Sequence, residues 1–582
     1  MVNKSKLTIA AIGMATVVLL TAQMGMIGAG GAAPPGKTAI SAKRQPYADL
    51  ANTDPFGCGT SAQATQYYPV WLPKLAAAGA RWERIGVGWG GVEPAKGKWD
   101  WSQLDAMIRT AAANHVFISS LLIGNPRWTG GRGLPVHDLA AWSDYVSHIV
   151  AHTAGKIDYW EIWNEPSRRS ARAYARVVVA AYNAAKKANP RVQIGLTVHS
   201  VDIVTLQDVI RDGAANHFDY IAVHPYEVFG ALQWGQESVF MHIIGRIRKM
   251  LAVYDPARVN VPIWITEVGM GPSSARPGDL IKAYAMGIAE GFAHIEWFEA
   301  MGEAYNMGLL NNAGRPTRSY AALKNMTRVM GSDPKYIGWV LLDGGGYGFI
   351  FHGAAGTVMA AWSRPGATGR VRLGSTVKIM DPVSGVVIKS ALVHLTGAPV
   401  LIMGAPAGVV IRAAANRTRP FPWAGNYTAA RQISWIAGKP DTADGLHWNR
   451  KITRAVSNVF HGRRAKFVGA SPGVSFTVDP NFLSFTPMPI TITAEVCQKA
   501  GGHAGFNLRY EATTGWKSIG WNSVPADGKW HTLRWKINDD EFVSDWGYNF
   551  SFWSDSTANS RYYIRKVSVI KDGMPGSGGR SN

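Results

Sequence analysis

The sequence predicts an α/β fold in which a (β/α)8 TIM barrel is followed by two all-β sandwich domains. Three observations carry this prediction. From Pro55 onward, short apolar runs alternate with stretches of helical periodicity, which is typical of βα units and a parallel sheet. Eight such runs occur before Met330, which is the number that closes a barrel. Beyond Met330 the pattern changes to short alternating runs separated by Gly and Pro turns, which indicates antiparallel sheets.

Residues 1–33 are expected to be a secretory signal peptide. Lys4 and Lys6 precede a short apolar centre, Leu7–Ala22, and small residues follow it. This predicts a protein that is secreted, periplasmic or held at the cell surface. The alternative is an uncleaved membrane anchor, since the uncharged stretch continues past Ala22 and lengthens the apolar span. Residues 34–50, which contain Pro-Pro-Gly and several basic residues, are expected to be a linker.

Residues 51–332 are expected to form the barrel. Its eight strands are predicted at Phe56–Gly59, Trp82–Gly86, Phe117–Ile123, Tyr159–Trp163, Gln193–Thr197, Tyr220–Val223, Ile263–Thr266 and Ile295–Phe298. The clearest helical patterns between or after them are Ala171–Lys187 and Arg318–Met330. In barrels of this kind the active site lies at the carboxyl ends of the strands. Polar and aromatic residues at those ends are therefore the candidates for function.

Two β-rich segments follow the barrel. Residues 333–415 are expected to form an accessory β-sandwich, and residues 416–427 a linker. Residues 428–572 are expected to form a jelly-roll-like domain that binds carbohydrate, because aromatic residues are dense there: Trp516, Trp521, Trp530, Trp535, Trp546, Trp553, Tyr562 and Tyr563. At least half of these rings must fill the core, so core packing is the alternative to sugar binding. Residues 573–582 are expected to be a disordered tail.

The charge of the chain limits the classes of partner. The formal net charge is +21 and the pI is near 9.8, which favours anionic partners. The sequence contains no nucleic-acid-binding motif and no P-loop, and nothing in it indicates a protein partner. A polysaccharide or oligosaccharide is expected, and an acidic one fits the charge; an ordinary basic surface is the alternative.

The cysteine and histidine pattern indicates no metal and no cofactor. Cys58 and Cys497 lie in different predicted domains, so two free buried thiols are expected, with one long-range bridge as the alternative. No His/Cys cluster has the spacing of metal ligands.

The stretch from Trp160 to Pro166 is the strongest functional signal in the sequence. Its apolar beginning predicts a buried strand. Asn164 and Glu165 should lie where that strand emerges, because polar groups without partners cannot stay inside it. Pro166 lacks an N–H and ends the strand. The alternative is that this tripeptide caps the start of a helix.

A second carboxylate, Glu267, closes the apolar run that begins at Val261. Two carboxylates, each at the end of a barrel strand, are what glycoside hydrolysis requires. With these motifs the segment from about Pro55 to Met330 resembles the clan A retaining glycoside hydrolases, most closely family 39, with family 5 as a near neighbour. The resemblance implies that Glu165 is the acid/base and Glu267 the nucleophile.

The same resemblance implies substrate-binding residues at the other strand ends. They are Arg84, Asn164, His224, Tyr226 and Trp297, together with Trp89 and Trp128, for which core packing is an equal alternative. Arg84 and Tyr226 are expected to hydrogen-bond the nucleophile. Asn164 is expected to reach the sugar 2-hydroxyl, and Trp297 to stack on the ring. His224 is expected in the same subsite, with a structural role as its alternative.

Three further glutamates near the strand ends receive no catalytic role, namely Glu161, Glu296 and Glu299. The expected reaction is double displacement at an O-glycosidic bond of a poly- or oligosaccharide. It requires a protonated Glu165, whose pKa should be raised by burial and by the charge of Glu267. The alternatives are a transglycosylase on the same barrel and a non-catalytic protein for glycan binding or exopolysaccharide assembly.

Overall fold

The structure, a computed structural model, describes residues 54–60, 68–230, 232, 235–271, 276–302, 306–343, 345–364, 367–421, 427–440, 444–449, 455–461, 463–468, 473–485, 487–544, 547–553 and 561–572. The expected signal peptide, the linker 34–50 and the tail 573–582 lie outside these residues. Within the described ranges, no helix has both the length and the apolar character that crossing a membrane would need.

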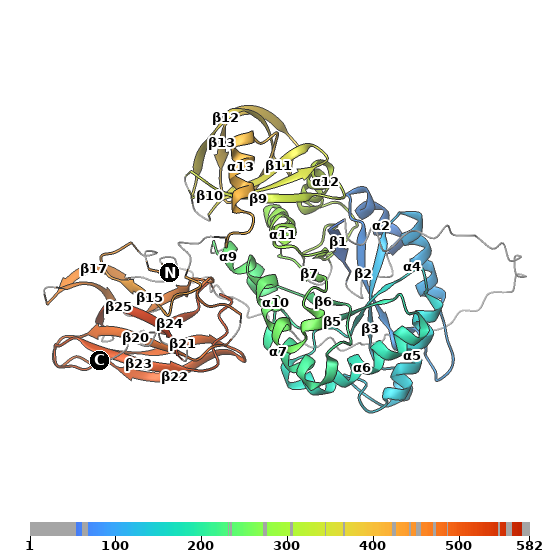
Figure 1. Ribbon diagram of the computed structural model, residues 1–582, viewed down its shortest axis with the longest axis horizontal. Helices are drawn as coiled ribbons and strands as arrows, with labels where there is room; N and C mark the ends of the chain where they lie inside the picture. The colour runs from blue at the N-terminus through green and yellow to red at the C-terminus, as the bar shows by residue number, and fades with distance from the viewer. Residues whose placement is uncertain are drawn as a thin grey trace, which may run out of the picture. The chain divides into compact units, whose positions relative to one another are not determined.

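Eight parallel strands close into a barrel that helices surround (Figure 1). The strands are β1 (Phe56–Gly59), β2 (Trp82–Gly88), β3 (Phe117–Ile123), β4 (Tyr159–Ile162), β5 (Gln193–Thr197), β6 (Tyr220–Val223), β7 (Ile263–Val268) and β8 (Ile295–Phe298). Each pairs with its neighbour in chain order, and β8 pairs with β1. The predicted barrel is confirmed, with each strand within two residues of its expected bounds.

The helices around the barrel follow the strands in the expected alternation. They are α2 (Tyr68–Ala77), α3 (Trp89–Val92), α4 (Ser102–Ala113), α5 (Leu139–His152), α6 (Ala171–Ala188), α7 (Ile203–Val209), α8 (Tyr226–Gly230), α9 (Glu237–Phe240), α10 (Ile243–Tyr254), α11 (Pro277–Glu290) and α12 (Arg318–Met330). Their apolar faces form one continuous core with the outer faces of the strands.

An aromatic layer fills the interior of the barrel at the amino-terminal ends of the strands. The ring of Trp264 packs against Trp82 and Tyr220 at centroid distances of 5.4 and 4.5 Å, and Phe117 packs on Trp82 at 5.0 Å. Gly195 in β5 makes room for this layer, because a Cβ there would lie 2.4 Å from the Tyr220 ring. His294, which directly precedes β8, packs on the same layer, with its ring centroid 4.3 Å from that of Trp82 and 4.2 Å from that of Trp264.

The segment after the barrel forms one six-stranded antiparallel sheet in the order β13-β12-β14-β11-β10-β9. Its strands are β9 (Lys335–Leu342), β10 (Gly346–Gly353), β11 (Gly356–Ser363), β12 (Gly369–Met380), β13 (Val387–Leu395) and β14 (Val400–Met403). The helix α13 (Ala407–Asn416) packs on β9 at Gly338, where a Cβ would lie 1.9 Å from the carbonyl oxygen of Ala413. The β-rich character was predicted, whereas this helix was not.

The last part of the chain forms two antiparallel sheets with apolar side chains between them. One has the order β17-β18-β25-β20-β23, with β15 also paired to β25, and the other has the order β16-β19-β24-β21-β22. The strands are β15 (Gln432–Ile436), β16 (Leu446–Trp448), β17 (Ala455–Phe460), β18 (Arg463–Val468), β19 (Val474–Val478), β20 (Ile490–Cys497), β21 (Gly505–Ala512), β22 (Gly515–Ser523), β23 (His531–Ile537), β24 (Phe550–Trp553) and β25 (Tyr562–Lys571). The predicted sandwich is confirmed. Trp546 lies outside the described residues.

Both cysteines have the state that the sequence predicted. Cys58 in β1 and Cys497 in β20 are free and buried. The alternative of a long-range disulfide is therefore wrong.

Candidate active site

The end of β4 has an unusual backbone conformation. Trp163 and Glu165 have φ angles of 69° and 46°, in the left-handed region that residues with a side chain rarely adopt. Each such residue costs on the order of 1–3 kcal/mol and persists only where the surrounding structure holds it. The two residues flank Asn164, so the turn aims Asn164 and Glu165 at the carboxyl end of the barrel.

This turn does not cap a helix. The next helical turn has Ser167 as its N-cap, and α6 has Ser170, and neither makes a side-chain capping bond. Asn164 instead accepts a hydrogen bond from Nη2 of Arg84 at 2.9 Å through its side-chain oxygen. The capping alternative for this tripeptide is therefore wrong.

Glu267, the penultimate residue of β7, accepts two hydrogen bonds. Nη1 of Arg84 donates to Oε1 at 2.5 Å, and the hydroxyl of Tyr226 donates to Oε2 at 2.9 Å. These are the two residues that the resemblance implied for this carboxylate. One donor on each oxygen fixes the direction of the carboxyl group, with a guanidinium charge in direct contact.

Glu161, to which the sequence analysis gave no role, is part of the candidate site. Its two oxygens accept hydrogen bonds from Nε and Nη2 of Arg84 at 3.0 and 3.1 Å, and the side chain is fully buried. This bidentate pair sets the orientation of the guanidinium that contacts Glu267 and Asn164. Period-two alternation along β4 offered a signal, since it allows residue 161 to face the barrel interior.

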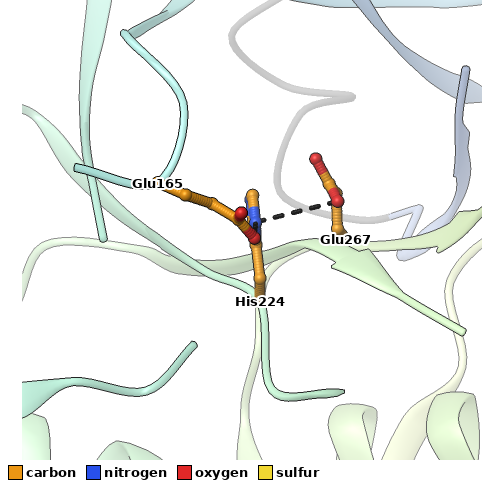
Figure 2. Close-up of side chains that lie close together, drawn as sticks. All are labelled: Glu165, His224 and Glu267. Atoms are coloured by element: carbon orange, nitrogen blue, oxygen red, sulfur yellow. Dashed lines mark hydrogen bonds and ion pairs between the residues drawn. The ribbon is translucent and has the colours of Figure 1, made fainter. Parts of the chain in front are cut away.

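His224 links the two glutamates. Its Nδ1 lies 2.8 Å from Oε1 of Glu165 and 3.8 Å from Oε2 of Glu267, and its Nε2 lies 3.1 Å from Oγ1 of Thr266. Figure 2 shows Glu165 and Glu267 on either side of the imidazole. The imidazole is fully buried, as a structural histidine would be, and it also contacts both carboxylates of the site.

The protonation of this pair differs from the expectation. Burial works to raise the pKa of Glu165, but the hydrogen bond and the charge of His224 lower it below its ordinary value. Burial works to lower the pKa of His224, but the charge of Glu267 and the bond to Glu165 raise it. The expected raised pKa of Glu165 is therefore wrong, because the hydrogen bond and the charge of His224 outweigh the effect of burial.

The three tryptophans expected at the site have different surroundings. Trp297 and Trp89 are both 0 % exposed, and the Trp297 indole donates to the carbonyl of Met307 at 3.1 Å. Trp128 is partly exposed and packs edge-on against Trp89 at a centroid distance of 5.6 Å. In this structure the rings of Trp89 and Trp297 belong to the core, and neither presents a face to solvent. A sugar-contacting role for Trp128 stays a prediction.

The other two glutamates of β8 and its loop are fully buried. Glu296 accepts a hydrogen bond from Oγ of Ser119 at 2.9 Å, and burial raises the pKa of Glu296 well above its ordinary value. Glu299 is likewise 0 % exposed. Neither lies where a substrate could reach it without rearrangement.

The two glutamates expected to be catalytic are brought together. One side-chain ligand atom from each of Glu165, His224 and Glu267 lies within 4.8 Å of the other two. Such a set could also bind a metal ion. However, Arg84 already places a cation on Glu267, and its Nη2 lies 3.4 Å from Nε2 of His224. Both oxygens of Glu267 already accept hydrogen bonds, from Arg84 and from Tyr226, so the arrangement suits proton transfer better than metal binding.

The fold has counterparts among solved structures. No protein-family model matches the sequence, and no curated protein matches it. The structure is similar to a family 39 glycoside hydrolase from the gut symbiont Bacteroides cellulosilyticus WH2, with a TM-score of 0.53 and 16% identity over 61% of this chain and 81% of that chain. A GH30 endoxylanase from Clostridium papyrosolvens C71 matches with a TM-score of 0.45 and 14% identity, over 61% of this chain and 98% of that one. At these identities the likeness concerns the fold. The chain shares its (β/α)8 architecture with the family 39 glycoside hydrolase.

Proposed function

We propose that the protein is a retaining glycoside hydrolase that cleaves O-glycosidic bonds in a poly- or oligosaccharide by double displacement. The observation that carries this proposal is the approach of Glu165 and Glu267, whose nearest carboxyl oxygens lie within 4.8 Å. Retaining enzymes hold their two carboxyl groups roughly 5–5.5 Å apart, whereas inverting enzymes need roughly 6.5–9.5 Å to admit a water.

Glu267 is the nucleophile in this proposal. One of its oxygens forms a bond to the anomeric carbon, while the bond from that carbon to the leaving oxygen breaks. The leaving oxygen takes a proton from Glu165. In the second step a water gives a proton to Glu165 and its oxygen bonds to the anomeric carbon, which releases Glu267 as a carboxylate.

The Glu165–His224 pair can supply the first proton without uptake from solvent. Movement of a proton across their 2.8 Å hydrogen bond converts imidazolium and carboxylate into neutral imidazole and protonated Glu165. The charge of Glu267 helps to raise the pKa of His224. When Glu267 bonds to the sugar it loses that charge, and His224 then holds its proton less tightly. Nucleophilic attack and protonation of the leaving group are thereby coupled.

Asn164 and Arg84 position the sugar and the nucleophile. Arg84 occupies the side-chain oxygen of Asn164 through a 2.9 Å hydrogen bond, which leaves the amide NH2 as the donor that faces substrate. A donor beside the nucleophile is suited to a hydroxyl next to the anomeric carbon. Such bonds strengthen in the transition state and contribute to catalysis.

The test is covalent trapping of the glycosyl-enzyme. A panel of 2-deoxy-2-fluoro glycosides with good leaving groups is incubated with the full chain, and the adduct is located by peptide mass spectrometry. A stoichiometric adduct on Glu267 is expected, together with first-formed products of retained configuration by NMR. An adduct on another residue, or a first product of opposite configuration, would refute the mechanism. Added acceptor sugars distinguish hydrolysis from transglycosylation, since only a transglycosylase diverts most of the product to them.

A further inference from the structure

The outer face of one sheet in the C-terminal sandwich carries polar and aromatic groups in register. Along β21, Phe506 and Leu508 are fully buried and belong to the sandwich core. Side chains alternate along a strand, so Asn507 and Arg509 face outward. Both are partly exposed.

Asn507 lies between two indoles on this outer face. It pairs with Trp521 of β22 on one side and with Trp553 of β24 on the other. Residues that pair directly share a face of the sheet, and neighbouring strands lie roughly 4.7–4.9 Å apart. The three side chains therefore form a row across the strands, with Arg509 beside it along β21.

The two indoles are not equivalent. The guanidinium of Arg509 lies 4.7 Å from the ring centroid of Trp553 and covers that ring. The Trp521 side chain is 44 % exposed. Its ring lies over Gly505, where a Cβ would come within 2.5 Å of the indole. The absence of a side chain at Gly505 lets the Trp521 ring lie along the sheet with its other face outward.

We propose that this row, formed by Trp521, Asn507 and Arg509, is a glycan-binding surface separate from the catalytic barrel. A pyranose ring stacks its C–H face on Trp521, because this contact removes the large, flat apolar face of the indole from water. The Asn507 amide and the Arg509 guanidinium hydrogen-bond hydroxyl or carboxylate groups of the neighbouring unit. The inference rests on the proposed function, which makes a glycan the ligand, and it names the face of the C-terminal sandwich that holds the polymer.

A purely structural role for Trp521 makes a different prediction. An aromatic side chain over a glycine stabilises a sheet by shielding its backbone. On that view any apolar side chain of similar reach would serve, and binding would not depend on the ring. Leucine and phenylalanine at position 521 separate the two roles, since leucine covers Gly505 without a flat ring.

The experiment uses the full chain with Glu267→Ala, so that no polymer is consumed. Native affinity electrophoresis is run in gels that contain polygalacturonate, xylan, mannan or a soluble glucan. We expect at least one polymer to retard the Glu267→Ala protein, which is the parent of all further variants. Adding Trp521→Leu should raise the dissociation constant for that polymer about tenfold or more. Trp521→Phe should retain most of the binding. The matched control is Ile519→Ala in the same strand, which removes a side chain 43 % exposed and should leave retardation unchanged.

Arg509→Gln then identifies the class of polymer. Loss of binding to polygalacturonate assigns a carboxylate contact to Arg509, and a small effect with neutral polymers assigns hydroxyl contacts; both outcomes support the surface. The proposal is overturned if no polymer retards the parent, if Trp521→Leu binds as the parent does, or if Ile519→Ala weakens binding equally. Thermal melting of each variant confirms that it is folded. Turnover of aryl glycosides by the wild-type chain tests catalysis separately, so the two proposals fail independently.

Discussion

Nδ1 of His224 lies 2.8 Å from Oε1 of Glu165, while Nε2 of the same ring lies 3.1 Å from the hydroxyl of Thr266. Thr266 precedes Glu267 in β7, so one imidazole joins the turn after β4 to the strand that carries the second carboxylate. Thr266 in turn lies 3.4 Å from Oε2 of Glu161, which holds Arg84. The protonation of His224 therefore depends both on the turn after β4, which carries Glu165, and on β7, which carries Thr266 and Glu267.

Removing the charge of Glu267 should lower the pKa of His224. That charge is the largest of the influences that raise it, acting against the effect of burial. In Glu267→Gln the pKa of His224, followed by NMR of a ring-labelled sample, should fall relative to the wild type. An unchanged value would show that nucleophile charge and proton position are not coupled.

The stability of the fold should depend on pH in two opposite ways at this pair. The pKa of His224 is raised in the folded state, so its contribution is present below its unfolded pKa near 6.5 and is lost as pH rises through the folded value. The pKa of Glu165 is lowered, so its contribution is present above about 4.5 and is lost as pH falls through the folded value. The Tm of the wild type minus that of His224→Asn should be largest between these limits. A difference that is constant with pH would contradict this account.

Replacing the two glutamates should give opposite stereochemical outcomes on rescue. Glu267→Ala should lose at least roughly 10⁴-fold in kcat, as expected for loss of a nucleophile. Azide then attacks in its place and gives a glycosyl azide of inverted configuration. Glu165→Ala should spare the first step for good leaving groups, and azide should give the retained product. Retained product from Glu267→Ala would assign the roles the other way round.

Glu161→Gln should destabilise the protein by roughly 3–5 kcal/mol, because it removes one partner of a buried ion pair. It should also lower kcat, since Arg84 loses the bidentate contact that orients it. Glu296→Gln is the matched control. Burial raises the pKa of Glu296 well above its ordinary value and so favours its neutral form, and an amide of the same shape should change the free energy of unfolding less. Chemical denaturation of both variants checks the difference, and equal losses would remove the special role of Glu161.

Tyr226→Phe should lower kcat by roughly 5- to 100-fold with little change in KM. The substitution removes the 2.9 Å hydrogen bond to Oε2 of Glu267 and leaves the ring in place. Tyr145→Phe is the control, because its buried hydroxyl bonds to backbone groups, among them the carbonyl of Val87 at 3.1 Å. A change confined to KM would indicate that Tyr226 contacts substrate rather than the nucleophile.

The sequence alone predicted the barrel and placed Glu165 and Glu267 at the ends of two of its strands. Strands such as Phe117–Ile123 are short apolar runs bounded by polar residues, and that pattern is local. Asn164-Glu165-Pro166 and Glu267 each end such a run, and parallel strands place their carboxyl ends at one rim. Because both facts depend only on neighbouring residues and on the topology of the barrel, no long-range contact had to be known.

Only the tertiary structure decided how the site works. Glu161 pairs with Arg84 across a separation of 77 residues, and which face of β4 it occupies depends on strand register. The lowered pKa of Glu165 depends on His224, 59 residues away, whose approach no local pattern encodes. Trp297 lies at a strand end, where the resemblance implied that it would stack on the sugar, yet packing buries it completely. Partner identity, burial and proton position are properties of side chains that meet from distant segments, so the pattern along the chain cannot specify them.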